Sequence, residues 1–366
     1  MGDASAEKRV GYSNRLVDIL NHGALNLAMG IGYRCGLFEA MDVLGSPQPV
    51  SAIANSAGLS ERYVKEWLGV MVTGGLVDLE QGADGENRFA LPRELGDLVT
   101  RRAGNSNLGV YTQEIPLLTA CAFEAVADGF KTGNGVPFSS YPPFHGFMAE
   151  LAEAKHRQVL VDTFLPSVEN GALVERMKTG IRVCDLGCAE GVAIVLMAEA
   201  FPRSRFVGID ISGEAIAVAE ASAARAGLSN TTFLVRDAAL LKEADEFASA
   251  FDYVTAFDAI HDQPRPLEAL QGVRHILAPG GAFSMIDIAA ATDVADNTGH
   301  PMGPFLYTVS LMHCMPVGLF GGGAGLGMMW GKEAAVDLLK AAGFSEVSVE
   351  NIPEDPFNLH FFCRKA

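Results

Sequence analysis

The chain of 366 residues is long enough for two domains with a substantial core. Apolar residues make up 49% of it, which is too many for a disordered chain, and the net charge of −17 argues against nucleic acid as the main partner. The six cysteines form no CxxC pair and no zinc-like spacing with histidines, and the first ten residues contain no apolar signal core. We therefore expect free thiols, no metal site and a cytoplasmic location.

The first third of the chain has the pattern of a winged-helix domain. Apolar residues recur at helical spacing through residues 14–43. A short helix over 51–57 and a second helix that Ser60 caps and that ends at residues 74–75 follow. The runs LVDLE and RFAL then flank the turn QGADGEN, which predicts a hairpin.

The second of these helices would enter a DNA groove in a transcriptional regulator. Its charged residues here are Glu61, Arg62, Lys65 and Glu66, whose charges cancel. Without a basic stripe, packing or dimerisation is the better interpretation of this domain than DNA binding.

The remainder of the chain predicts an α/β fold with a Rossmann-like sheet. Residues 106–178 are helical and partly aromatic, and form bridging helices and an active-site lid. From residue 179 onward strand-like and helical runs alternate, which specifies a parallel sheet with helices on both faces. The last two runs, SEVSVENI and LHFFCRKA, predict antiparallel edge strands. The expected domains are therefore 1–105, 106–178 and 179–366.

Residues 301–331 contain no acid and no Lys or Arg, and could be mistaken for a membrane span. Three prolines and the run GGGAGLG do not suit a spanning helix. A short apolar helix followed by a glycine-rich loop is the better prediction, and no membrane partner is expected.

The stretch VCDLGCAEG, residues 183–191, has the form of a strand that leads into a ligand-binding turn. Ligands of open parallel sheets bind at the carboxyl ends of the strands. Gly187 and Gly191 allow a close approach of backbone to ligand, and the helix from Val192 points its first N–H groups at the same place. A tight turn without a ligand is the alternative, because many folds use such a turn.

Acids end the next two strands, and each could bind part of an adenine nucleoside. Asp210, which lies 19 residues after Gly191, can accept hydrogen bonds from both ribose hydroxyls. Asp237 can accept one from the adenine amino group, with the N–H of Ala238 beside it. Each acid alone could instead cap a helix.

Asp185 distinguishes between the adenine cofactors. The glycines of an NAD fingerprint, GxGxxG, face a pyrophosphate. Here Gly187, Ala189 and Gly191 stand in the turn with Asp185 ahead of them. A carboxylate repels phosphates and suits a ligand that carries a cationic amino group.

These motifs resemble the class I S-adenosylmethionine-dependent methyltransferases over about residues 180–366. The resemblance rests on the DxGxxxG turn, the two nucleoside acids, the LAPGG turn at 277–281 and the closing strand pair, with Ala189 in place of the usual glycine. It implies a seven-stranded sheet, S-adenosylmethionine as cofactor and S-adenosylhomocysteine as product. The cofactor residues it implies are Asp185, Gly187, Cys188, Ala189, Gly191, Asp210, Ile211, Asp237, Ala238 and Phe257.

His261 follows the fourth strand of the sheet, in FDYVTAFDAIHDQPRP, beside the expected methyl group. A histidine pKa near neutrality suits a general base, although a histidine that only bonds the loop backbone is the alternative. Winged-helix small-molecule O-methyltransferases carry HDW here, and this chain resembles them at His261 and Asp262 but has Gln263. In those enzymes later acids orient the histidine, and Asp287 and Glu333 are the candidates here.

Nearly the whole chain is also similar to a group of bacterial and animal methyltransferases with DAIHDQ and a YPPFH…MAE segment. Its lid and pocket candidates are Tyr141, Phe144, His145, Met148, Met312, His313 and Phe320, each of which could instead be core. An uncharged, Met- and Gly-rich insertion suits a flexible apolar pocket wall, and His313 is a second possible base.

The leading hypothesis is a cytoplasmic methyltransferase that acts on a small, aromatic or hydrophobic hydroxyl compound with His261 as base. Methylation of nitrogen or sulfur stays open, because the fold is shared. A DNA-binding regulator that senses the cofactor and a nicotinamide oxidoreductase are the other hypotheses. The family resemblance implies a homodimer through the N-terminal domain.

Overall fold

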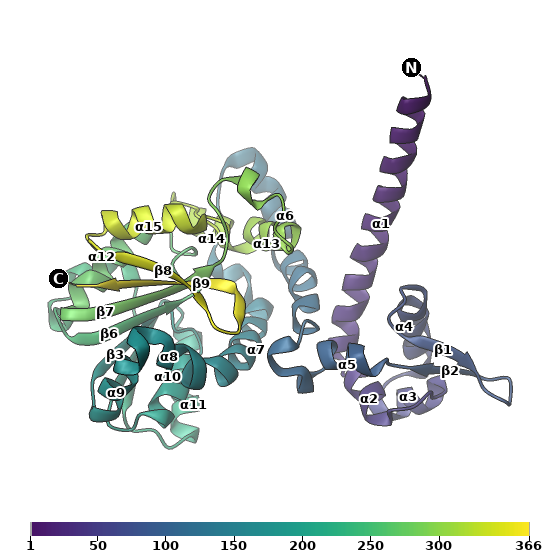
Figure 1. Ribbon diagram of the computed structural model, residues 1–366, viewed down its shortest axis with the longest axis horizontal. Coiled ribbons are helices and arrows are strands. Elements are labelled where there is room, and N and C mark those ends of the chain that lie inside the picture. The colour runs from purple at the N-terminus through teal and green to yellow at the C-terminus, as the bar shows by residue number, and fades with distance from the viewer. Residues whose placement is uncertain (1, 366) are drawn as a thin grey trace. The chain divides into compact units, whose positions relative to one another are not determined.

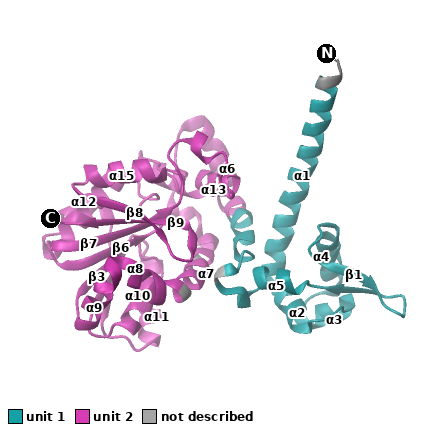
Figure 2. Cartoon of the chain, in the orientation of Figure 1, with its two compact units in different colours: residues 1–117 teal, residues 118–366 magenta. Residues whose placement is uncertain are grey.

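The computed structural model describes residues 2–365, except for the side chains of residues 2–4, 105, 145 and 158. The chain divides into two compact units, residues 1–117 and 118–366 (Figure 2). The division falls within helix α6 (Glu114–Thr132), which continues from one unit into the other. The expected three-part division, with boundaries after residues 105 and 178, stays a prediction.

The first unit contains the predicted winged helix, preceded by a long helix. Helices α3 and α4 are followed by the antiparallel hairpin β1–β2, as the sequence predicted (Figure 1). Ser60 stands at the N-cap of α4, but its side chain makes no capping hydrogen bond, contrary to the prediction. The elements of this unit are α1 (Gly2–Arg34), α2 (Leu37–Leu44), α3 (Val50–Ala57), α4 (Glu61–Thr73), β1 (Asp78–Gln81), β2 (Asn87–Ala90), α5 (Arg93–Val99), η1 (Arg101–Ser106) and η2 (Val110–Gln113).

Helix α4 packs inward with one face. Val64, Trp67, Leu68 and Met71 are buried at the spacing of a single helical stripe. The indole Nε1 of Trp67 donates a hydrogen bond to the carbonyl of Ala28, 2.8 Å away. This face of the helix therefore belongs to the core of its own unit.

Helix α1 has the opposite character, because it leaves large apolar side chains in solvent. Leu16, Leu20, Leu27 and Ile31 are all more than half exposed. Their spacings of four, seven and four residues place them along one face of the helix.

The second unit is a seven-stranded sheet covered by helices, with a helical region before it. Its elements are α6, η3 (Phe138–Ser140), α7 (Pro142–Val159), η4 (Leu160–Phe164), α8 (Leu165–Ser167), η5 (Val168–Gly171), α9 (Ala172–Thr179), β3 (Arg182–Leu186), α10 (Val192–Ala200), β4 (Arg205–Asp210), α11 (Gly213–Arg225), β5 (Thr231–Val235), η6 (Ala238–Glu243), η7 (Asp245–Phe247), β6 (Phe251–Phe257), α12 (Pro266–Ile276), β7 (Leu277–Ile288), η8 (Val294–Asn297), α13 (Gly303–Val309), η9 (Ser310–Cys314), α14 (Met315–Leu319), α15 (Gly331–Ala341), β8 (Val347–Ile352) and β9 (Asp355–Arg364).

The strand order is β5-β4-β3-β6-β7-β9-β8. All neighbouring strands are parallel except β9, which is antiparallel to both β7 and β8, so the predicted closing pair is confirmed. The order reverses between β3 and β6, and a ligand of such a sheet binds outside the carboxyl ends of these strands. The topology therefore places the turn after β3 and the loop after β6 at the same edge.

Each face of the sheet forms its own core. Helices α12 and α15 cover one face, and α9, α10 and α11 cover the other (Figure 1). Alternate residues of a strand enter opposite cores, as Val183 and Cys184 of β3 do. Because these strands are buried on both faces, their sequences are nearly continuous apolar runs.

The uncharged segment 301–331 forms short helices and a glycine-rich loop, as predicted. Helix α13 continues into the π-helical turn η9 and then into α14, whose second residue is Pro316. A π-helical turn inside an α-helix inserts a residue and commonly marks a functional site. No helix within residues 2–365 is both long and apolar enough to cross a membrane.

Gly208, a buried glycine on β4, should determine how closely the turn after β3 packs against the sheet. A Cβ atom at Gly208 would lie 2.7 Å from Cys188 Sγ and 2.7 Å from a ring carbon of Phe233. Gly208→Ala should therefore lower the free energy of unfolding by roughly 1–3 kcal/mol through overpacking. Urea denaturation measures this, with Gly213→Ala as control because its Cβ would meet nothing closer than 3.9 Å. Equal stability of the two variants would contradict the packing described.

Candidate active site

The turn after β3 is held in a conformation that suits glycine. Gly187, Ala189 and Gly191 all have positive φ, at 71°, 46° and 75°. A Cβ at Gly187 would lie 2.5 Å from the Cβ of Ala259, so a side chain there is excluded. Ala189 adopts this conformation at some strain, which is a physical reason for a glycine at this position in related turns.

Asp210 at the end of β4 binds this turn. Its Oδ2 accepts the N–H of Ala189 at 2.9 Å, and its Oδ1 accepts the N–H of Ser212 at 2.8 Å. The N–H groups of Gly187 and Cys188 also point to β4, where they donate to the carbonyl of Ile209. The carboxylate is thereby fixed at the edge where a ligand would lie, next to the exposed side chain of Ile211.

Asp237 caps the short helix η6, which is the alternative role that the sequence analysis gave to this acid. Its Oδ1 accepts the N–H of Ala239 at 2.9 Å, and its Oδ2 forms an ion pair with Arg265 at 2.6 Å. Ala238 beside it is buried. A bound adenine would have to share this carboxylate with Arg265.

Asp185 is a buried acid that has a hydroxyl as its partner and, among the residues that the structure describes, no cation. It is 3% exposed and accepts a hydrogen bond from Thr255 Oγ1 at 2.7 Å. Burial raises the pKa of Asp185 to about 7, the Thr255 hydrogen bond opposes this, and the charge of Asp210 adds to it. A ligand with an ammonium group would relieve the cost of ionising this carboxyl, so the residues present fit a cofactor of that kind.

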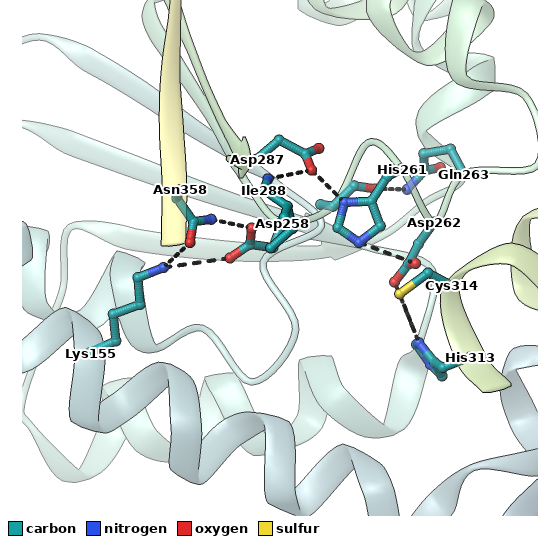
Figure 3. A network of polar contacts seen from close by, with 11 residues as sticks. Lys155, Asp258, His261, Asp262, Gln263, Asp287, Ile288, His313, Cys314 and Asn358 are labelled. Atoms are coloured by element: carbon teal, nitrogen blue, oxygen red, sulfur yellow. Dashed lines mark hydrogen bonds and ion pairs between the residues drawn. The ribbon is translucent and has the colours of Figure 1, made fainter. Parts of the chain in front are cut away.

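His261, in the loop after β6, is oriented by Asp287 on β7. Its Nδ1 lies 2.8 Å from Asp287 Oδ1, which also accepts the N–H of Ile288 at 2.8 Å (Figure 3). Both side chains are at most 3% exposed. Because Nδ1 bonds the carboxylate, Nε2 is the ring nitrogen that remains for chemistry.

The charge state of His261 depends on its acidic neighbours. Burial lowers the pKa of His261, but the charges of Asp287 and Asp262 outweigh it, so the pKa lies well above the usual value. Gln263, which stands where the similar O-methyltransferases of the sequence analysis carry tryptophan, donates to the carbonyl of Ala259 at 3.1 Å and so bonds the same loop.

A second group of side chains surrounds Nε2 of His261. Asp262 Oδ1 lies 3.5 Å from this nitrogen, and Asp262 Oδ2 lies 3.9 Å from His313 Nδ1. Cys314 Sγ lies 3.7 Å from His313 Nδ1. The sequence analysis did not select Cys314, although its position next to His313 could have drawn attention to it.

The expected lid residues also gather at His313. The rings of Tyr141 and Phe144 have centroids 4.7 Å from that of His313, and the Tyr141 hydroxyl donates to the carbonyl of Met312 at 2.7 Å. Tyr141, Phe144, Met312 and His313 are buried, Met148 is half-buried and Phe320 is 48% exposed. The side chain of His145 lies outside the described residues.

Two other expected site residues lie apart from His261. The carboxylate of Glu333 accepts the N–H of Thr292 at 2.9 Å, and its side chain is 53% exposed. No contact between Glu333 and His261 is found, so Asp287 alone of the two predicted acids orients the histidine. Phe257, at the end of β6, packs its ring against those of His156 and Phe164.

The sequence analysis also did not identify a polar network that lies beside the site. Asp258 follows β6 with a φ of 49° and accepts a hydrogen bond from Asn358. Lys155 of α7 bonds Asn358 Oδ1 at 2.8 Å and pairs with Asp355 at 2.8 Å and Asp258 at 3.8 Å (Figure 3). Helix α7 is thus joined to the ends of β6 and β9.

Two family models match the chain. Residues 177–303 match a model described as a methyltransferase domain, and residues 23–101 match one described as an Rv2258c-like winged HTH domain. A curated relative, the demethylmenaquinone methyltransferase of Listeria monocytogenes serotype 4a (strain HCC23), is 28% identical over 113 residues. These are 31% of this chain and 46% of the relative, so the chain spans less than half the length of the curated relatives it matches.

Solved structures resemble the chain over nearly its full length. Human N-acetylserotonin methyltransferase in complex with SAM has a TM-score of 0.67 at 16% identity and covers 97% of this chain and 98% of its own. The mitomycin 7-O-methyltransferase has a TM-score of 0.67 at 16% identity, with 98% and 99% covered.

An O-methyltransferase of neocarzinostatin biosynthesis, in complex with SAM and 2-hydroxy-5-methyl naphthoic acid, is also similar. It has a TM-score of 0.62 at 15% identity, with 93% of this chain and 95% of its own covered. At such identities the likeness establishes the fold. The chain therefore joins a winged-helix domain to a methyltransferase domain and has the fold of the class I S-adenosylmethionine-dependent methyltransferases.

Proposed function

We propose that this protein transfers a methyl group from S-adenosylmethionine to a hydroxyl of a small hydrophobic or aromatic molecule, with His261 as general base. The observation that carries the proposal is the buried His261–Asp287 pair at the carboxyl edge of the sheet. A histidine held in one tautomer beside strand-end carboxylates is an arrangement that can position and deprotonate a hydroxyl.

Three acids would hold the cofactor. Asp185 suits the amino group of the methionine part, because it is a buried carboxyl without a cation. Asp210 suits the ribose hydroxyls and Asp237 the adenine amino group, as each ends its strand at the ligand edge. S-adenosylmethionine, when bound, supplies an electrophilic methyl group on its sulfonium.

The acids beside it raise the pKa of His261, so the ring must first lose its proton on Nε2; the neutral ring would then take the hydroxyl proton there as the substrate oxygen becomes nucleophilic. Asp287 keeps the opposite nitrogen protonated and stabilises the imidazolium that forms. Tyr141, Phe144 and Met312 provide an apolar neighbourhood that favours an aromatic substrate. Two of the similar structures carry aromatic small molecules in their names, which supports this choice of substrate class.

The protein is proposed to work in the cytoplasm as a homodimer. Its six cysteines are free thiols, which a reducing compartment preserves. The exposed apolar face of α1 (Leu16, Leu20, Leu27 and Ile31) is of the kind that a second copy would bury.

Cofactor affinity should depend on pH through Asp185. The free protein has a pKa of about 7 at this carboxyl, and a bound ammonium group lowers it, so binding releases a proton below pH 7. Affinity for S-adenosylhomocysteine should fall as the pH falls below 7, by up to about tenfold per unit. Calorimetry at pH 5.5, 6.5 and 7.5 measures this.

Asp185→Asn should bind more weakly, and its affinity should lack this dependence. Asp337→Asn, at an exposed position on α15, is the control that should keep it. The same pH profile in wild type and Asp185→Asn would remove Asp185 from the cofactor site.

His261→Ala should reduce turnover by about 10²–10⁴ and leave the affinity for S-adenosylhomocysteine unchanged, because a base acts on the substrate rather than on the cofactor. A labelled-cofactor assay on a metabolite extract identifies the acceptor, and single-turnover rates then compare variants. His275→Gln is the control, since His275 lies at the opposite edge of the sheet, where its carbonyl accepts the N–H of Ser249. Wild-type rates in His261→Ala would leave positioning alone as the mechanism.

The double variant Leu20→Glu, Leu27→Glu should convert a dimer into a monomer, because it places two charges on the apolar face of α1. Light scattering coupled to gel filtration measures the mass in solution. Val43→Glu, at a residue of α2 that is 83% exposed, should remain dimeric. A wild-type monomer, or a double variant that keeps the mass of a dimer, would contradict dimerisation through this face of α1.

A further inference from the structure

The side chains around Nε2 of His261 include three potential metal ligands. One atom each of His261, Asp262 and Cys314 lies within 4.8 Å of the others. His313 Nδ1 borders this group, 3.9 Å from Asp262 Oδ2 and 3.7 Å from Cys314 Sγ (Figure 3). Imidazole and thiolate ligands bind zinc and similar soft cations in preference to magnesium or calcium.

The distances agree with a tetrahedral site. Bonds of about 2.0–2.3 Å from zinc to nitrogen, oxygen and sulfur place neighbouring ligand atoms about 3.3–3.8 Å apart. His261 Nε2 lies 3.5 Å from Asp262 Oδ1, and Cys314 Sγ lies within 4.8 Å of a ligand atom of each. The sulfur would therefore need to move inward by at most about 1 Å, and solvent would fill the fourth position of the cation.

Two independent features support a ligand between these side chains. Asp262 Oδ1 is buried and has no hydrogen-bond partner within the described part of the chain. His261 has the carboxylate–histidine arrangement of metal-binding histidines, since Asp287 accepts from its other nitrogen at 2.8 Å. Asp262 Oδ1 faces His261 Nε2 at 3.5 Å, where either a proton on the ring or a bound cation would balance its charge.

We propose that His261, Asp262 and Cys314 bind one soft divalent cation of the zinc type, and that this cation inhibits methyl transfer. The inhibition rests on the proposed function, because the metal takes the lone pair of Nε2 that the base would use. The binding itself does not depend on that function. Cys314 binds as thiolate, so its proton passes to solvent when the cation enters.

Cobalt tests the site directly, because tetrahedral cobalt with a thiolate ligand absorbs visible and near-ultraviolet light. Full-length protein is freed of metal with a chelator and titrated with Co²⁺, and bound zinc is measured by mass spectrometry. We expect one cobalt per chain with tetrahedral bands, displaced by one equivalent of zinc. Cys314→Ser should lose the thiolate band, and Asp287→Asn should weaken affinity by about 10–100-fold.

Cys363→Ser is the matched control, since Cys363 is a buried thiol on β9 that belongs to a different core. Loss of the band in this variant, or no stoichiometric binding in the wild type, would overturn the site. Zinc should also abolish methyl transfer in the wild type, and chelator should restore it. Faster transfer with zinc would overturn the inhibition.

The two proposals fail separately. Metal-free protein that binds S-adenosylhomocysteine but methylates nothing in an extract would count against the proposed function and leave the cobalt spectrum intact. A protein that methylates but yields no cobalt bands would keep the proposed function and remove the metal site.

Discussion

The contact between Asp287 and His261 is the interaction on which the rest of the site depends. It joins two neighbouring strands, because Asp287 lies on β7 and His261 follows β6, and the backbone holds both ends. The N–H of Asp258 bonds the carbonyl of Ile286, and the N–H of Ile288 bonds Asp287 itself. The orientation of the ring, and therefore the direction of Nε2, follows from the parallel pairing of these strands.

Burial of acids without matching cations is the second feature of this edge of the sheet. With its pKa raised to about 7, Asp185 is only partly ionised at neutral pH, and a positive group nearby would complete its ionisation. Asp262 and Asp287 lie beside His261, and their charges favour a positive charge on the imidazole ring or next to it. A proton, a cationic cofactor and a soft metal ion would each satisfy part of this demand, so pH and metal are expected to compete with substrate.

The sequence predicted the elements well because strand and helix patterns are local, and it located Asp210 and Asp237 at the carboxyl ends of β4 and β5, where their binding of a nucleoside stays a prediction. It placed Asp287 correctly beside His261 for the same reason. Glu333 was expected there too, but it lies on α15, in the segment after β7 whose position no sequence pattern fixes. Its carboxylate accepts the N–H of Thr292 instead. Cys314 lies 53 residues after His261 and enters the site through a π-helical turn, which no periodicity reveals.

The central claim concerns where the cofactor lies, and a crystal structure of the complex with S-adenosylhomocysteine tests it most directly. The account predicts that the amino group bonds Asp185, that the ribose lies at Asp210 and that the sulfur faces Nε2 of His261. A nucleoside bound at another edge of the sheet, or an imidazole of His261 that points away from the sulfur, would contradict it.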